Sequence, residues 1–338
     1  MILFIGNMLS SHGLSPAMSE LLAIKLAKDF ELKKISTKRN MFVRIVDMLS
    51  QIVWYRNLCK FVILDVFSSR AFWYAVTCAW LLRKLQIPYI TILRGGGLPD
   101  RIRKNPSMSN LVFKQAYANI SPSSYLARNF KTYGYPVNII PNFIDLERYV
   151  FRHRVDVKPR LLWVRSFHTI YNPMLAIKIL ELVREVYPEA SLCMVGPDKD
   201  GSRKIVEELA VSKGLSHLVE FTGKLSKSEW ITKSASFDIF INTTDYDNMP
   251  VSVLEAMALG FPVISTNVGG VPDLIQDEQN GLLVIPNDAK EFTTKILALL
   301  EKPELAASLS ASARVFAESY AWEKVKPHWV QLLTKNQQ

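Results

Sequence analysis

The sequence predicts an α/β protein with two domains, each a doubly wound parallel sheet of the Rossmann type. Short apolar runs alternate with helical stretches along the chain, and the alternation restarts after a polar, charged segment at residues 145–159. The length of 338 residues is also enough for two domains of ordinary size. We expect a first domain at 1–150, a second at 151–320, and a C-terminal helix at 321–338 that packs back on the first.

The expected strands and helices place the candidate site loops. In parallel sheets, ligands bind beyond the carboxyl ends of the strands, so the loops that follow the strands matter more than the helices. The first half predicts strands at 2–6, 61–66, 88–93, 118–121 and 137–140, with helices at 15–28 and 70–85 and after 124. The second half predicts strands at 160–164, 190–195, 219–222, 239–242 and 262–266, with helices at 173–187, 200–213 and 251–259.

Composition favours a globular protein without a metal site. Hydrophobic residues make up 49% of the chain and charged residues 21%, and neither the three cysteines nor the five histidines cluster. The first residues read as a buried strand and lack the features of a signal peptide. The longest apolar run, at 71–82, is shorter than the roughly 20 residues that span a bilayer. We expect a cytoplasmic protein, either free in the cytosol or peripheral on the inner face of the membrane.

The charge is concentrated in the first half. Residues 1–150 carry 20 basic and 8 acidic side chains, whereas residues 151–338 carry 21 and 23. A basic half suits an anionic membrane, an acidic acceptor or nucleic acid, or it merely keeps the protein soluble. Residues 41–56 mix aromatic, aliphatic and basic side chains at helical spacing, which is typical of an interfacial helix or of a core-facing one. We favour an anionic membrane surface and expect no nucleic-acid partner.

The strongest functional signal lies at residues 242–275. A strand ends in a polar loop, Pro250 then opens a helix, and Gly260 ends it. The free N–H groups at the start of this helix form an anion site, and two carboxylates, Asp247 and Glu255, flank it. This arrangement suits a sugar nucleotide, which has hydroxyls on both sides of its phosphates. The predicted donor-binding residues here are Asn248, Met249, Pro250, Val251 and Ser252.

This segment resembles the family-4 glycosyltransferases, which are retaining enzymes of the GT-B fold. The resemblance rests on two acidic residues eight positions apart, the text Ala-Met-Ala-Leu-Gly-Phe-Pro-Val-Ile at 256–264, and Gly-Gly-Val-Pro at 269–272. The first acidic residue of the family is usually Glu, whereas Asp247 stands here. The resemblance implies two Rossmann-like domains facing a central cleft. It also implies a hexosyltransferase-type enzyme (EC 2.4) that needs no metal and no cofactor, since the nucleotide sugar is a substrate.

The resemblance also assigns roles. Arg165, which follows the strand at 160–164, corresponds to the phosphate-binding arginine; Glu255 would bind ribose and Asp247 the transferred sugar. The family's lysine about five residues after that arginine is missing, because Ile170 or Tyr171 stands in its place. Arg165 then carries the diphosphate charge alone, or with His168 or Arg94. The plainer alternatives are a surface salt bridge for Arg165 and an ordinary loop histidine for His168.

Further donor and acceptor contacts are expected in four loops. Gly196 and Leu225 lie in loops that resemble those holding the base, and Gly13 lies in a loop that lets phosphates approach the backbone. The run Arg94, Gly95, Gly96 and Gly97 resembles a motif of surface-polysaccharide glycosyltransferases and is the candidate acceptor side; the alternative is a permissive turn. Asp245 and Asp247 also form an Asp-x-Asp pattern, which admits a weaker metal-binding interpretation.

The predicted function is therefore transfer of a sugar from a nucleotide sugar to a cell-surface glycan or lipid-linked acceptor, with retention of anomeric configuration. A UDP-sugar is the expected donor, because UDP is the commonest donor nucleotide in the family that the sequence resembles. Polysaccharide or lipopolysaccharide assembly is the expected setting. A dehydrogenase or epimerase is disfavoured because the glycines after the first strand, Gly6 and Gly13, do not form Gly-x-Gly-x-x-Gly. A non-catalytic binding protein, either a two-lobe sugar binder or a nucleic-acid binder, is disfavoured by the acidic pair and its intact context. A degenerate glycosyltransferase that binds a nucleotide or glycan without catalysis stays open because the lysine is missing.

Overall fold

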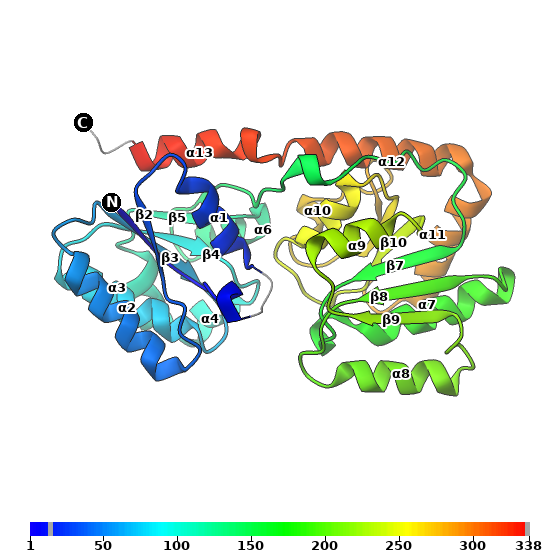
Figure 1. Cartoon of the computed structure of the whole chain (residues 1–338), viewed down its shortest axis with the longest axis horizontal. Coiled ribbons are helices and arrows are strands. Elements are labelled where there is room, and N and C mark those ends of the chain that lie inside the picture. The colour runs from blue at the N-terminus through cyan, green and yellow to red at the C-terminus, as the bar shows by residue number, and fades with distance from the viewer. Residues whose placement is uncertain (13–15, 335–338) are drawn as a thin grey trace. The chain divides into compact units, whose positions relative to one another are not determined.

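The chain forms two compact α/β units that divide between Pro141 and Asn142. The computed structural model describes residues 1–12 and 16–334, and Figure 1 shows the order of their elements along the chain. Each unit has its own parallel sheet and its own buried core. The expectation of two doubly wound parallel sheets is therefore confirmed.

The N-terminal unit contains a six-stranded sheet with the order β2-β1-β3-β4-β5-β6, in which every pair is parallel. Its strands are β1 (Ile2–Ile5), β2 (Leu32–Ile35), β3 (Phe61–Val66), β4 (Tyr89–Leu93), β5 (Ala118–Ser121) and β6 (Asn138–Ile139). Its α-helices are α1 (Met18–Leu26), α2 (Met41–Tyr55), α3 (Phe72–Lys84), α4 (Leu98–Lys104), α5 (Pro106–Phe113) and α6 (Ser124–Thr132), and η1 (Ser10–His12) is a short 3-10 helix.

The strand order places the helices of this unit on both faces of the sheet. The chain moves one way from β1 to β2 and the other way from β2 to β3, so right-handed crossovers put α1 and α2 on opposite faces. The helix α2 packs beside α3, and α3 packs beside α5. Their inward side chains join those of β1, β3 and β4 in one apolar core. The sides of α2 and α3 that point away from this core face solvent.

The C-terminal unit contains a second six-stranded parallel sheet, with the order β12-β11-β10-β7-β8-β9. Its strands are β7 (Arg160–Val164), β8 (Ser191–Val195), β9 (Val219–Gly223), β10 (Ile239–Asn242), β11 (Val263–Thr266) and β12 (Leu282–Val284). Its α-helices are α7 (Pro173–Val186), α8 (Ser202–Ser212), α9 (Lys227–Ser234), α10 (Val251–Ala258), α11 (Ala289–Glu301), α12 (Pro303–Glu318) and α13 (Trp322–Thr334). The 3-10 helices are η2 (Leu146–Arg148), η3 (Thr169–Tyr171) and η4 (Val271–Asp273).

Alternating side chains of the central strands supply two separate cores in this unit. Leu161 and Trp163 of β7 belong to the core shared with α7, α8 and α11, whereas Leu162 between them belongs to the core shared with α9, α10 and α12. The neighbouring strands β8 and β10 alternate in the same way. Because successive side chains of a strand point to opposite faces, strands buried on both sides read as continuous apolar runs.

The topology of this sheet directs attention to β7 and β10. These two adjacent strands lie where the strand order reverses, since β8 and β9 follow on one side of β7 and β11 and β12 follow on the other side of β10. In doubly wound sheets, ligands bind in the crevice that opens at this position, beyond the carboxyl ends of the strands. The loops after β7 and β10 carry Arg165 and Asp247.

The C-terminal helix α13 begins at a fixed point of this unit. Ile144 accepts a hydrogen bond from the Trp322 backbone N–H (3.2 Å) and donates one to the Tyr320 carbonyl (2.9 Å). The Trp322 ring also packs against Phe143, with ring centroids 4.8 Å apart. Within the described residues, no helix is both long and apolar enough to cross a membrane.

Candidate functional site

Arg165 is the residue immediately after β7, and a close backbone contact fixes its position. Its N–H donates to the Val195 carbonyl at the end of β8 (3.0 Å). A Cβ atom at Gly196 would lie 1.8 Å from the Arg165 carbonyl oxygen, which is well inside contact distance. Gly196 was predicted as a donor-binding residue; the structure places it against the backbone that carries Arg165. A side chain at this position would push the arginine away from the strand end.

The Arg165 guanidinium is buried beside a carboxylate and an aromatic ring. It forms an ion pair with Asp247 and lies 4.2 Å from the Tyr171 ring centroid. Its Nε is buried and has no hydrogen-bond partner among the described residues. Burial lowers the pKa of Arg165, while Tyr171 and Glu255 oppose that change. An unpartnered buried donor on a cationic group fits a phosphate oxygen, which accepts charge-assisted hydrogen bonds.

Asp247 lies in the loop between β10 and α10, and its backbone is held by the two glycines at 269 and 270. The Gly270 N–H donates to the Asp247 carbonyl (3.0 Å). At Gly269, where φ is +54°, a Cβ atom would lie 2.0 Å from the same carbonyl oxygen. The Gly-Gly pair therefore permits two loops to approach closely and fixes Asp247 opposite Arg165.

The loops after β7 and β10 are bonded to each other. The Asp245 N–H donates to the Ile170 carbonyl (2.9 Å), and the Thr243 hydroxyl donates to the Tyr171 carbonyl (2.8 Å). Thr243 in turn accepts a hydrogen bond from the Trp163 indole N–H (2.9 Å). Arg165 and Asp247 thus belong to one hydrogen-bonded set of loops at the reversal of the strand order.

The start of α10, which follows the loop of Asp247, offers an unpartnered hydroxyl. Pro250 precedes the helix as its N-cap and makes no side-chain cap, and the first helical N–H groups have no carbonyl partner within the helix. Asn248 and Met249 are buried, and the buried Ser252 Oγ has no hydrogen-bond partner in the described part of the chain. Val251, the first residue of α10, is half-buried. Such a helix start favours an anion.

Glu255 lies one turn into α10 and has partners that the sequence did not indicate. It is 5% exposed, accepts a hydrogen bond from the Tyr149 hydroxyl (2.8 Å) and forms an ion pair with Lys227, the first residue of α9. Burial and the Glu255 charge raise the pKa of Tyr149, so that its hydroxyl keeps its proton. Lys227 opens α9, four residues beyond the end of β9, and no local sequence pattern marks it as a partner of Glu255.

Three other residues considered from sequence have defined surroundings. His168 caps η3, because its Nδ1 accepts from the Ile170 N–H (3.1 Å). Asp245 accepts a hydrogen bond from the Asn172 side chain (3.1 Å), so it has a different partner from Asp247. Leu225 packs at the margin of the core around α9 and α10.

Gly13, another predicted donor-binding residue, lies outside the described residues. Within those residues, no group of three or more His, Cys, Asp or Glu side chains could hold a metal ion.

The glycine-rich run of the N-terminal unit surrounds a second arginine–carboxylate pair. Arg94 Nε donates to Asp65 Oδ1 on the neighbouring strand β3 (3.0 Å), and both side chains are buried. A Cβ atom at Gly95 would lie 2.4 Å from the Ser68 backbone N, and one at Gly97 would lie 3.3 Å from the Ser68 Oγ. Gly96 continues this loop, whose acceptor role stays a prediction. These glycines pack the loop after β4 against the loop after β3.

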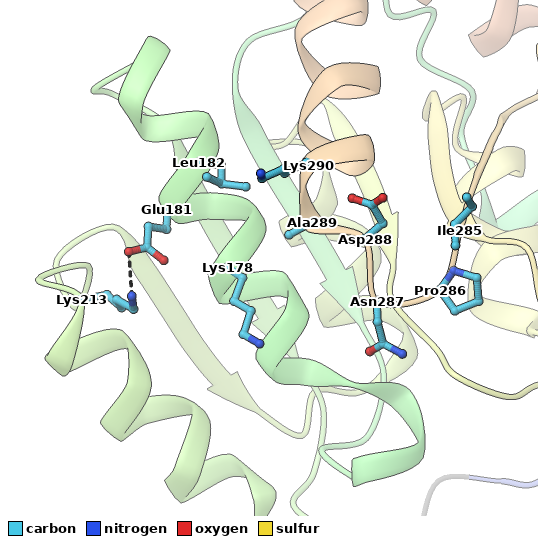
Figure 2. Close-up of a pocket in the computed structure, with 10 residues that line it drawn as sticks. All are labelled: Lys178, Glu181, Leu182, Lys213, Ile285, Pro286, Asn287, Asp288, Ala289 and Lys290. Carbon is cyan, nitrogen blue, oxygen red and sulfur yellow. Dashed lines mark ion pairs between the residues drawn. The ribbon is translucent and has the colours of Figure 1, made fainter.

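An open hollow of about 610 Å³ lies elsewhere in the C-terminal unit, between α7 and the loop before α11. Figure 2 shows Lys178 on α7, Asn287 and Pro286 on that loop, and the ion pair between Lys213 and Glu181. None of the predicted site residues lines it. The Asn172 side chain donates to Asn287 and also to Asp245, and so connects its rim to the loop of Asp247.

Comparison with known proteins agrees with this fold. HepE of Anabaena, solved in complex with UDP and also with UDP-glucose, superimposes with a TM-score of 0.80 for the UDP complex, at 16% identity, over 99% of each chain. The fold is therefore GT-B, two Rossmann-like domains, and this expectation is confirmed.

The sequence comparisons then place the chain in a family. The profile of the family "Glycosyl transferases group 1" matches residues 147–316, about half of the chain. The protein belongs to this family. The sulfoquinovosyl transferase SQD2 of Arabidopsis thaliana is 30% identical over 152 residues, which are 44% of this chain and 28% of that protein. A glycosyltransferase of Methanocaldococcus jannaschii is 27% identical over 268 residues, 77% of this chain and 72% of that protein.

Proposed function

We propose that this protein transfers a hexosyl group from a UDP-sugar to a saccharide or lipid-linked acceptor, with retention of anomeric configuration. The observation that carries the proposal is Arg165, a buried cation with an unpartnered Nε, at the reversal of the strand order. The unpartnered Ser252 Oγ at the start of α10 adds a second donor for an anion. UDP and UDP-glucose as ligands of HepE, and family membership, support the choice of donor.

The chemistry requires fixed positive charge where the nucleotide departs. Breaking the bond between sugar and phosphate leaves negative charge on the diphosphate, and preorganised donors stabilise it. Arg165, Ser252 and the N–H groups at the start of α10 would serve this purpose. The acceptor hydroxyl would form the new bond to the anomeric carbon and pass its proton to the departing phosphate. In this proposal neither a metal nor a covalent protein intermediate takes part.

The two carboxylates would hold the two ends of the donor. Glu255 would accept hydrogen bonds from ribose hydroxyls through the oxygen that Tyr149 and Lys227 leave available, because both of these bind Oε1. Asp247 would accept hydrogen bonds from the transferred sugar. Because Asp is one methylene shorter than the usual Glu, the sugar must approach the loop more closely.

The acceptor side of the proposal rests on charge. The excess of basic residues in the first half of the chain suits a lipid-linked or phosphorylated acceptor in cell-surface polysaccharide or lipopolysaccharide assembly. A protein with this role would work at the inner face of the membrane. Arg94 and Gly95–Gly97 are the proposed acceptor-side residues.

A ligand-binding panel tests the donor site. Thermal unfolding would be followed with UDP, GDP, ADP and their common glucose conjugates, with and without EDTA. Binding to the folded state raises its stability by mass action, about 2.7 kcal/mol at a hundredfold excess over Kd. We expect UDP and UDP-glucose to raise the midpoint with EDTA present, and Arg165→Ala and Glu255→Ala to abolish the shift. Arg203→Ala is the matched control, since Arg203 pairs with Glu207 on the surface of α8.

Turnover separates an enzyme from a binding protein. Slow hydrolysis of UDP-glucose in the absence of acceptor, measured as release of UDP, should exceed that of Arg165→Ala. A shift with UDP but no release with any acceptor extract would instead favour the degenerate glycosyltransferase, to which the missing lysine after Arg165 points. No shift with any nucleotide at millimolar concentration would contradict the donor site itself.

A further inference from the structure

The helix α2 exposes an apolar face. Its inward side buries Arg44, Met48 and Ile52. On its outward side Phe42 is 72% exposed, Val46 66% and Trp54 80%. At 3.6 residues per turn, positions 42, 46 and 53 fall almost on one line, and positions 43 and 54 fall on another about 100° away. Exposed apolar side chains therefore occupy most of the outer surface of α2, namely Phe42, Val43, Val46, Val53 and Trp54, with Leu58 just beyond the helix end.

Such a face requires a partner. Single exposed apolar residues are ordinary on soluble proteins, whereas a contiguous apolar patch marks a site of protein or membrane contact. Burying an aromatic side chain such as Phe42 from water contributes about 1.5–3 kcal/mol. The neighbouring helix α3 extends the surface, since it packs beside α2 and leaves Trp73 and Trp80 nearly half exposed. The observations call for an extended apolar surface as the partner.

Charge at the margins of the face indicates which partner it is. Lys38 and Arg39 precede α2, Arg56 and Lys60 follow it, and all four are exposed. The sole acid within α2 is Asp47, which is half-buried. The Lys84 Nζ on α3 lies 4.3 Å from the Trp80 ring centroid. Tryptophan beside lysine or arginine at the edge of an apolar surface is the composition of a membrane interface, in which rings lie at headgroup level and cations reach anionic lipid.

We propose that the outer face of α2, with the exposed tryptophans of α3, docks on an anionic lipid bilayer. The helix would lie in the plane of the interface, with Phe42, Val46 and Trp54 among the headgroups and the flanking basic residues on lipid phosphates. The inference rests on the proposed function for its biological setting, namely delivery of a lipid-linked acceptor. It draws on no residue of the donor site.

Co-sedimentation with vesicles tests the proposal on the full chain. The wild-type protein should pellet with equimolar phosphatidylglycerol and phosphatidylcholine at low salt, and much less with phosphatidylcholine alone. Phe42→Ser with Trp54→Ser should weaken binding to the anionic vesicles at least tenfold. The control is Val211→Ser with Val315→Ser, which replaces side chains of the C-terminal unit that are 66% and 69% exposed. It should pellet as the wild type does.

A charge variant and a solution measurement complete the test. Lys38→Glu with Arg39→Glu should weaken binding to anionic vesicles, and added salt should do the same to the wild type, because the attraction is screened over about 10 Å at 0.1 M. Failure of the wild type to pellet with anionic vesicles, or equal pelleting of the Phe42/Trp54 variant, would overturn the proposal. So would a wild-type dimer, seen by size exclusion with light scattering, that this variant converts to a monomer without vesicle binding.

The result is independent of catalysis. All of the exchanged side chains are exposed, so thermal unfolding of each variant should match that of the wild type and will show that it folds. Vesicle binding without a UDP shift would support the docking surface and contradict the proposed function. A UDP shift without vesicle binding would support the donor site and contradict the docking surface.

Discussion

The two units each place an arginine one residue beyond the end of a central strand, but the surroundings of the two arginines differ. Arg94 follows β4 and pairs with Asp65 within the neighbouring strand β3, where the two side chains are 9% and 1% exposed. Arg165 follows β7 and pairs with Asp247 in a loop, where both side chains are 14% exposed. The first carboxylate is part of the sheet, whereas the second is held by backbone contacts with Gly269 and Gly270.

From this difference we expect the Arg94 pair to matter chiefly for stability and the Arg165 pair chiefly for ligand binding. Burial raises the pKa of Asp65, and the Arg94 charge opposes that rise, so the pair balances a cost of folding. Arg165 instead pairs with a loop carboxylate at the reversal of the strand order, which is where doubly wound sheets bind ligands. We therefore expect mutation of the two arginines to give opposite patterns of change in activity and stability.

The largest expected effect on activity comes from Arg165→Ala. Loss of the cation should lower kcat/KM by about 10²–10³-fold, the usual cost of removing one preorganised donor to a developing charge. The midpoint of thermal unfolding should fall less than in Arg94→Ala, because Asp247 is 14% exposed whereas Asp65 is 1% exposed. Steady-state release of UDP and differential scanning calorimetry measure the two quantities. If the variant unfolds at a much lower temperature but keeps its activity, Arg165 stabilises the fold and does not bind the donor.

The second effect is on stability, from Arg94→Ala. It should reduce the free energy of unfolding by about 3–5 kcal/mol at neutral pH, because a buried carboxylate loses its cation. The pKa of Asp65 would rise further, and a raised carboxyl pKa makes the folded state gain stability as pH falls. The deficit relative to the wild type should therefore shrink between pH 8 and pH 5 in denaturant titrations. A deficit that is constant with pH would contradict this role of Asp65.

The third effect comes from the glycine behind Arg165. In Gly196→Ala the new methyl would meet the Arg165 carbonyl oxygen at 1.8 Å, so the strand end must shift. We expect a loss of at least about 3 kcal/mol of stability, at the upper end for overpacking, together with loss of the UDP-induced shift. Gly201→Ala is the matched control, since φ is +84° there and no atom lies within 4 Å. It should cost about 1–2 kcal/mol and leave UDP binding unchanged.

The smallest effect concerns Lys227, which we consider a positioning residue for Glu255. Lys227→Met should raise KM for the donor about fivefold through a loss of roughly 1 kcal/mol, with kcat unchanged. Lys227→Arg should restore most of the affinity. Lys233→Met, on the same helix and paired with Glu220, should have no effect on KM. An equal fall in kcat for Lys227→Met would assign Lys227 to the chemical step.

The sequence predicted those parts of the fold that depend on local pattern. Buried strands such as β3 and β8 are predominantly apolar runs, and the loop–helix segment around Asp247 and Glu255 carries a recognisable sequence motif. The strand β2 was missed because Leu32-Lys33-Lys34-Ile35 is an edge strand with two lysines, which resembles a loop. The expected strand at 137–140 reduces to the two residues of β6.

The missed site residues depend on contacts that no local pattern contains. Tyr149 reaches Glu255 across 106 positions of sequence, and Lys227 reaches it across 28. Arg94 was considered as a diphosphate ligand because a strand end with glycines is a common ligand site. Its pairing with Asp65 follows from the adjacency of β3 and β4, which requires the strand order. The roles proposed for Arg165, Asp247 and Glu255 stay predictions.

The ion pair between Arg165 and Asp247 gives the protein an anion of its own at the cation that a donor needs. A diphosphate that binds this guanidinium must displace the Asp247 carboxylate. Because Asp247 is part of the same chain, its carboxylate stays at a high local concentration near the guanidinium. Under the proposed function, each exchange would also release Asp247, so that the carboxylate proposed to bind the sugar becomes available when the nucleotide arrives. Singly charged anions such as chloride should bind Arg165 weakly. To bind, they must displace Asp247, which carries the same charge, so they gain less binding free energy than they would at an arginine without a carboxylate partner.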